Sequence, residues 1–155
     1  IEDKVSAIFK SVDDIEYYRE VMLSVPLGKP VWSYWVTSRY GTRSDPFKKT
    51  KARHKGVDLA SRTGNKVNVK GQGKVIRAEY AGAYGNLVVV DHGNGFQTKY
   101  AHLNKIYVKK GDRLEINDTV GEVGSTGRST GPHLHYEVLY KGVNVDPLPF
   151  LKAKI

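Results

Sequence analysis

The sequence Gly-Pro-His-Leu-His-Tyr-Glu-Val occupies residues 131–138, and it predicts a β-strand. Successive side chains of a strand point to opposite faces of a sheet, so His133 and His135 project on the same side. The apolar side chains next to them point the other way, into a core: Leu134, Tyr136 and Val138. A strand holds two imidazoles at a fixed separation, which suits a metal site. The alternative is that both rings lie on an exposed sheet face without a ligand.

Similar short β-rich runs, separated by Gly, Asn and Pro, occupy the chain from Val31 onwards. Residues 65–70 alternate with Val67 and Val69 facing inward, and residues 87–90 form an apolar run typical of a central strand. Residues 92–95 predict a turn, because glycine and asparagine accept positive φ at little cost. Further strands are expected at residues 74–80, 97–103, 134–139 and 143–145. This pattern predicts a mainly β fold, an antiparallel β-sandwich or barrel.

The first 25 residues differ from the rest in charge and in periodicity. Their net charge is −3, so the remaining residues carry +12, since the whole chain carries +9. Apolar residues recur there at three- and four-residue steps, which predicts a helix over residues 4–23: Val5, Ile8, Phe9, Val12 and Ile15. We therefore expect an N-terminal helical segment, residues 1–25, and one domain, residues 26–155. The helix either docks on the domain or belongs to a longer helical region upstream.

The composition restricts the class of protein. The 155 residues suffice for one domain with a hydrophobic core, and no apolar run approaches the roughly 18 residues of a membrane span. Cysteine is absent, which excludes disulfides, thiolate metal sites and thiol nucleophiles. The positive charge indicates an anionic partner, whether nucleic acid, cell wall or an acidic membrane. The N-terminus shows neither an initiator Met nor a signal peptide, so we expect a processed protein or an excised fragment.

A second group of metal-ligating residue types is the sequence His-Lys-Gly-Val-Asp at residues 54–58. In an extended chain His54 and Asp58 share a face, and Gly56 leaves room for a close approach. Two histidines and one carboxylate offer three ligands to zinc with a fourth position open for water, which is the pattern of catalytic rather than structural sites. From the residues alone, His133 and His135 cannot be told apart as ligands, and Asp58 could instead cap a turn.

His102 and His92 are the remaining histidines. By strand alternation His102 shares a face with Tyr100 and Thr98, and near a metal-bound water it could act as a general base or polarise a carbonyl. A structural role is the alternative. His92 belongs to the predicted turn, and we expect it at the rim of a cleft.

Other signatures of function are absent or incomplete. The Gly-rich residues 124–131 lack the Lys-Ser/Thr ending of a phosphate-binding loop, and neither a Gly-x-Ser-x-Gly elbow nor a His-Glu-x-x-His helix occurs. One basic run could contact nucleic acid, but no DNA-binding motif accompanies it, so we expect no nucleic-acid partner: Arg43, Lys48, Lys49, Lys51, Arg53 and Lys55.

Taken together and in this order, four blocks of sequence resemble the LytM-type, or lysostaphin-like, zinc metallopeptidases of peptidoglycan. The blocks are His54-x-Gly56-x-Asp58, residues 100–103, residues 124–127 and residues 129–135, and the resemblance extends over residues 37–147. The resemblance implies an antiparallel β-sandwich with a groove and one zinc ion per chain. It implies His54, Asp58 and His135 as the zinc ligands, with His102 and His133 as catalytic histidines beside the metal. For substrate contacts we expect Tyr100, Thr130 and His92.

The expected function is hydrolysis of peptide crosslinks in bacterial peptidoglycan, in the cell envelope or the extracellular wall. We expect the D-alanyl–diaminopimelate crosslink rather than a polyglycine bridge, because an acidic helix before the domain resembles envelope proteins of Gram-negative type. The alternative is a non-catalytic wall-binding or regulatory domain that activates another murein hydrolase. Residues 1–25 could also hold an intact enzyme inactive.

Overall fold

The computed structural model describes residues 2–44 and 51–153, so Lys48 and Lys49 of the basic run lie outside the described residues. These two stretches contain two α-helices, one 3-10 helix and thirteen strands: α1 (Glu2–Ser24), β1 (Trp35–Ser38), β2 (Gly41–Ser44), β3 (Lys51–His54), β4 (Val57–Ala60), β5 (Lys66–Asn68), β6 (Gly73–Tyr80), η1 (Gly82–Tyr84), β7 (Asn86–Gly93), β8 (Phe96–Leu103), β9 (Lys105–Ile106), β10 (Arg113–Leu114), β11 (Thr119–Glu122), β12 (His133–Tyr140), β13 (Val143–Val145) and α2 (Leu148–Lys152).

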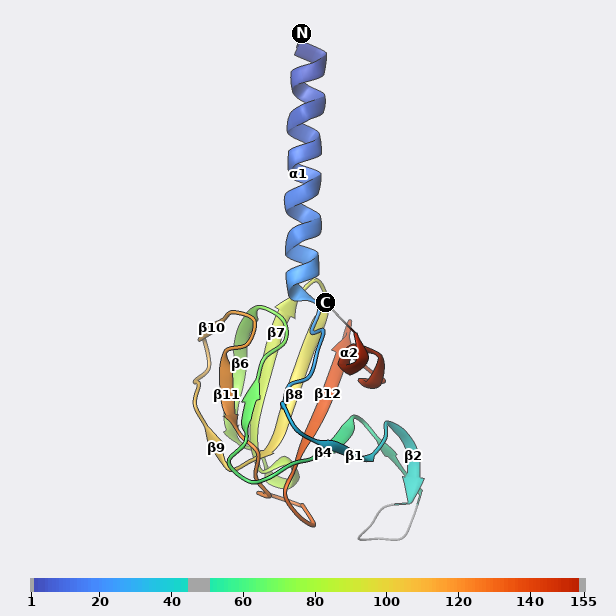
Figure 1. Cartoon of the computed structure of the whole chain (residues 1–155), viewed down its shortest axis with the longest axis vertical. Coiled ribbons are helices and arrows are strands. Elements are labelled where there is room, and N and C mark those ends of the chain that lie inside the picture. The colour runs from blue at the N-terminus through green and yellow to red at the C-terminus, as the bar shows by residue number, and fades with distance from the viewer. Residues whose placement is uncertain (1, 45–50, 154–155) are drawn as a thin grey trace.

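Two sheets and one separate pair of strands make up the domain (Figure 1). The large sheet has the order β1-β4-β12-β8-β7-β6-β10, with β13 paired to β12, and the small sheet has the order β5-β11-β9. Strands β2 and β3 form a pair of their own. Every strand pairing in the described residues is antiparallel. The predicted fold class, an antiparallel β-sandwich with an N-terminal helix, is confirmed.

The main core lies between the two sheets. Val67 of β5 and Val120 of β11 pack in one cluster with residues of the large sheet, among them Val88, Tyr100 and Tyr136. The alternation predicted for β12 is confirmed, because its apolar side chains are fully buried in this cluster: Leu134, Tyr136 and Val138. Burying such side chains contributes about 1.5–3 kcal/mol each, which holds β12 and its histidines in register.

Strand β7 is buried on both faces, as its continuous apolar run predicts. Val88 and Val90 join the main core, whereas Leu87 and Val89 pack on the other face of the sheet with Ala101 of β8. A turn with positive φ at Asn94 and Gly95 then leads into β8.

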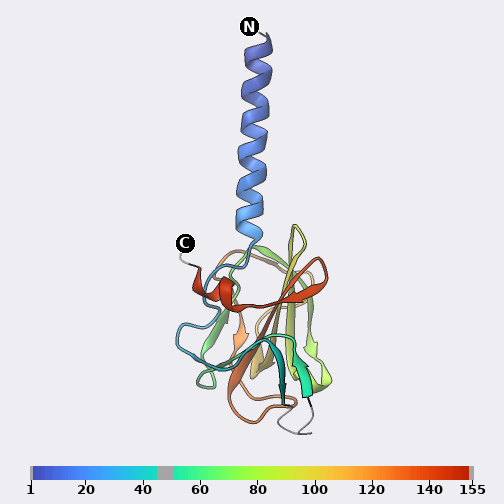
Figure 2. The ribbon, with the colours of Figure 1, turned by 90° about the vertical axis from the view of Figure 1, so that its right-hand side faces the viewer.

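Helix α1 stands away from the sheets instead of packing along them (Figures 1 and 2). Its residues 10–20 are all exposed, including Ile15, whose exposure is 68%. Among its described residues only the C-terminal end is held, where Leu23 O accepts from Gln72 N at 2.8 Å and Asn94 Nδ2 donates to Ser24 Oγ at 3.1 Å. The helix therefore does not dock along its length. No helix in the described part of the chain has both the length and the apolar character needed to cross a membrane.

Candidate metal centre

A cleft of about 410 Å³ lies against the large sheet. It lies where β12 begins, at His133, and where β8 ends, at His102 and Leu103. Its walls come from β1, β3, β4, η1, β8, the segment before β12, and β12 itself: Thr37, Ser38, Arg53, His54, Lys55, Asp58, Ala83, Tyr84, His102, Arg128, Ser129, Thr130, His133, His135 and Glu137.

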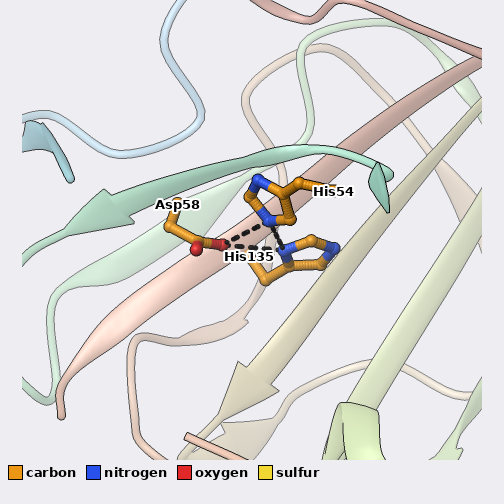
Figure 3. A group of neighbouring side chains, drawn as sticks. All are labelled: His54, Asp58 and His135. Carbon is orange, nitrogen blue, oxygen red and sulfur yellow. Dashed lines mark hydrogen bonds and ion pairs between the residues drawn. The ribbon is translucent and has the colours of Figure 1, made fainter. Parts of the chain in front are cut away.

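Three of these side chains converge inside the cleft (Figure 3). Asp58 Oδ1 lies 2.8 Å from His135 Nδ1 and 3.1 Å from His54 Nε2, and the two nitrogens lie 3.1 Å apart. All three residues are buried. The sheet brings them together, because Asp58 of β4 is paired directly with His135 of β12.

Gly56 explains how His54 comes so close to the strand pair. A Cβ at this position would lie 2.3 Å from the backbone oxygen of Tyr136 in β12. Only glycine therefore fits where the chain turns from β3 into β4, as the sequence pattern indicated.

The outer nitrogen of each imidazole faces an acceptor, which determines where the protons are. His54 Nδ1 lies 2.8 Å from the carbonyl oxygen of Arg39, and His135 Nε2 lies 3.1 Å from the carboxylate of Glu137. Because neither partner can donate, both outer nitrogens carry the proton. The lone pairs of His54 Nε2 and His135 Nδ1 consequently point inward, towards the carboxylate of Asp58.

This donor set suits a divalent cation. Three inward lone pairs without a proton between them repel one another, and a cation at their centre removes the repulsion. Donors about 2.0–2.1 Å from a tetrahedral zinc ion lie roughly 3.3 Å from one another, close to the separations observed. Burial would raise the pKa of Asp58, but hydrogen bonds from the protonated forms of His135 and His54 hold it far below its usual range, so the carboxylate is ionised.

His102 and His133 lie beside this group. Their rings are 4.7 Å apart between centroids, and His133 Nε2 is 3.8 Å from Asp58 Oδ1. His102 Nδ1 donates to Thr126 O at 2.7 Å and His133 Nδ1 to Gly131 O at 2.8 Å. Each neutral ring thus keeps an Nε2 lone pair that can accept a proton. Burial lowers the pKa of His102 to about 4, so this ring is neutral at pH 7.

The face predicted for His102 is wrong. Tyr100 points into the main core, whereas His102 lines the cleft. The pairing of β7 with β8 shifts register between Asn86 and Val88, and His102 has φ of 60°. This β-bulge interrupts the alternation and turns His102 to the cleft side.

Of the three residues expected to contact substrate, the structure brings only Thr130 to the cleft. The prediction for Tyr100 is wrong because its ring is 0% exposed in the core, where it contacts Thr98. The prediction for His92 is wrong because it is buried outside the cleft, bonded to Gln72 O and to Thr98 Oγ1, both at 2.8 Å.

Sequence reasoning did not identify Glu137 and Tyr84. Glu137 continues the alternation of His133 and His135, so its place on the cleft face could have been found from the strand pattern. Burial raises its pKa, but hydrogen bonds from His135, Tyr84 and Asn144 outweigh that effect and lower the pKa to about 2. Tyr84 lies in the 3-10 helix η1, far from His135 in the sequence. Nothing in the residues around Tyr84 predicts that its ring contacts His135.

An open three-donor centre flanked by two proton-accepting histidines, in a cleft on a β-sandwich, is the site of a metal-dependent hydrolase. Peptidase family M23 matches residues 52–147, and the chain belongs to this family. The resemblance to lysostaphin-like zinc metallopeptidases is thereby confirmed, and zinc is the cofactor of the family.

Individual relatives agree with the family assignment. The peptidoglycan DD-endopeptidase ShyA of Vibrio cholerae is 41% identical over 128 residues, which make up 81% of this chain and 29% of ShyA. A zinc-containing peptidase from Vibrio cholerae superposes with a TM-score of 0.71 at 36% identity, over 85% of this chain and 40% of that chain. The catalytic domain of the antimicrobial peptidase lysostaphin from Staphylococcus simulans gives 0.70 at 31% identity, over 77% and 93%. The chain spans less than a third of the curated relatives that it matches.

Proposed function

We propose that residues 26–155 are the catalytic domain of a zinc-dependent endopeptidase that cuts peptide crosslinks of bacterial peptidoglycan, with residues 1–25 as a separate helical segment. The observation that carries the proposal is the convergence of His54, Asp58 and His135, with inward lone pairs, in a cleft shared with two more histidines. These three residues hold one zinc ion per chain.

When bound, zinc supplies a Lewis acid that lowers the pKa of a water to about 7 and polarises the scissile carbonyl. The Nε2 atom of His133 or of His102 accepts the proton of the attacking water and returns it to the departing amine. The other histidine, once protonated at Nε2, hydrogen-bonds the oxyanion of the tetrahedral intermediate. The carbonyls of Thr126 and Gly131 accept from Nδ1 of the two rings, so Nε2 of each ring is left for these roles.

The charge around the cleft supports a carboxylate-bearing substrate. Arg53, Lys55 and Arg128 line the cleft and are exposed, and no acidic side chain in the lining is exposed. A D-alanyl–diaminopimelate crosslink carries carboxylates close to the scissile bond, whereas a polyglycine bridge carries none. The name of ShyA, a DD-endopeptidase, points to the same substrate. We therefore propose the diaminopimelate crosslink as the substrate and, with it, an exported protein that acts in the cell envelope.

Metal analysis combined with wall digestion tests this function. We expect about one zinc per purified chain and release of crosslink fragments, identified by mass spectrometry, from diaminopimelate-type wall but not from polyglycine-bridged wall. His133→Ala should keep the zinc and lose the release. Wall digestion by zinc-free protein would overturn the mechanism. A zinc-loaded chain that cuts neither wall but activates an amidase would establish the regulatory role instead.

A further inference from the structure

One buried charge takes no direct part in the proposed hydrolysis. Glu137 lies in β12 two residues after His135 and is 0% exposed. An ionised carboxylate in a protein interior costs several kcal/mol unless it is paired and hydrogen-bonded. Its partners therefore reveal what the charge does there.

Both carboxylate oxygens of Glu137 are occupied by donors from four different elements. Oε1 accepts from Tyr84 Oη of η1 at 2.7 Å and from His135 Nε2 at 3.1 Å. Oε2 accepts from Asn144 Nδ2 of β13 at 2.8 Å and pairs with Lys99 Nζ of β8 at 3.1 Å. Because four donors on separate elements bind its two oxygens, the carboxylate group of Glu137 is held in one orientation.

The backbone at Lys55 and Gly56 also packs against Glu137 and its partner Asn144. A Cβ on Gly56 would lie 3.0 Å from Glu137 Cγ, and Lys55 O accepts from the same Asn144 amide at 3.0 Å. The segment that joins His54 to Asp58 thus lies directly against Glu137.

The fixed carboxylate of Glu137 determines which nitrogen of His135 carries the proton. An acceptor held rigidly at Nε2 keeps the proton on that nitrogen, so the lone pair stays on Nδ1, which faces Asp58 and His54. A carboxylate behind a metal-binding imidazole also makes the ring a stronger donor.

We propose that Glu137 is a positioning residue, which locks His135 in the Nε2-protonated tautomer and orients Nδ1 towards the cation, with Lys99 as its counter-charge. This inference rests on the proposed ligand role of His135. The competing explanation is that Glu137 and Lys99 are a buried ion pair that serves only the fold.

The first test compares Glu137→Gln with Glu79→Gln, a control at an exposed carboxylate of β6. We expect zinc affinity, measured by competition with a chromophoric chelator, to fall about 10–100-fold in E137Q and to stay unchanged in E79Q. In NMR spectra of the zinc-loaded protein, the downfield His135 Nε2 proton should move upfield and exchange faster in E137Q. An E137Q affinity within about two-fold of wild type would overturn the role of Glu137. A wild type that binds no zinc would instead overturn the ligand set itself.

A second variant separates positioning from a purely structural ion pair. Glu137→Met combined with Lys99→Met removes both charges together, so no unpaired ammonium is left buried. If Glu137 acts through His135, the double variant still binds zinc about 10–100-fold more weakly than wild type. Recovery to within about two-fold would show that the pair serves only the fold, and this outcome also decides the matter should E137Q fail to fold.

Discussion

Gly56 shows at the residue scale how a missing side chain shapes the centre. Its backbone lies against Tyr136 O of β12, an atom that cannot move without breaking the pairing that places Asp58 beside His135. The glycine allows the turn from β3 to β4, and that turn brings His54 to the other two donors.

We predict that Gly56→Ala lowers the free energy of unfolding by about 1–3 kcal/mol, the usual cost of overpacking, and weakens zinc binding as well. Urea denaturation and a zinc titration measure both effects. Gly131→Ala is the matched control for stability, because a Cβ there meets nothing within 4 Å. Equal stability of G56A and wild type would contradict the close approach.

The five residues of the centre divide into two groups that substitution should separate. His54→Ala or Asp58→Ala removes a proposed ligand, so we expect loss of the bound zinc and of activity together. His102→Ala should retain the zinc and lose about 10²–10⁴-fold in rate, the usual contribution of general acid–base catalysis. Zinc content by mass spectrometry, measured beside the rate of wall digestion, distinguishes the groups. Loss of zinc in H102A would assign that residue to the metal instead.

At the scale of elements, the β7–β8 hairpin contains a buried histidine whose charge state matters for stability. His92 of β7 bonds to Thr98 of β8, and burial lowers its pKa below the ordinary 6.5. The folded protein therefore binds fewer protons at this site than the unfolded chain as the pH falls below 6.5. The free energy of unfolding is therefore not reduced by this group above pH 6.5. Below pH 6.5 it falls, by at most about 1.4 kcal/mol per pH unit, because the unfolded chain takes up the proton first.

We accordingly predict that the unfolding free energy of His92→Gln falls less steeply between pH 6.5 and pH 5 than that of wild type, the range being set roughly by the ordinary histidine pKa. Urea denaturation at several pH values gives the two slopes. Identical slopes would mean that His92 takes up its proton in the folded state.

Helix α1 contacts the domain at its C-terminal end. Its residues 10–20 are exposed, and among the described residues none of α1 lines the cleft. We predict that removing residues 1–20 leaves the thermal unfolding midpoint and the rate of wall digestion unchanged, because Val21 to Ser24 and their contacts are kept. Digestion that appears only in the shortened chain would show that the helix restrains the enzyme.

At the scale of the whole molecule, charge is divided between an acidic helical segment and a domain that carries +12. Anionic polymers of the wall should attract such a domain, and salt screens interactions between exposed charges. We predict that binding to insoluble cell wall, measured by co-sedimentation, weakens strongly as salt is raised. Salt-independent binding would point to recognition by uncharged groups.

Much of this architecture could be predicted from the pattern of apolar and polar residues along the sequence. The strands expected at residues 65–70, 74–80, 87–90, 97–103, 134–139 and 143–145 and the buried face of β12 follow from the pattern of apolar side chains along the chain. The turn expected at residues 92–95 lies at residues 94–95, because His92 and Gly93 belong to β7. The candidate ligands were also recognisable, because the distinctive blocks of residues that carry them stand in a fixed order along the chain.

The sequence by itself thus determined the fold class, the family and the set of histidines and aspartate to consider. Tertiary structure alone decided which of their atoms meet. The bulge in β8 turned His102 towards the cleft, the core enclosed Tyr100, and Glu137 with its partners chose the free nitrogen of His135. These outcomes depend on strand register and on contacts between residues far apart in the chain, such as His54 and His135, which are 81 positions apart. Neither is encoded in the spacing of neighbours.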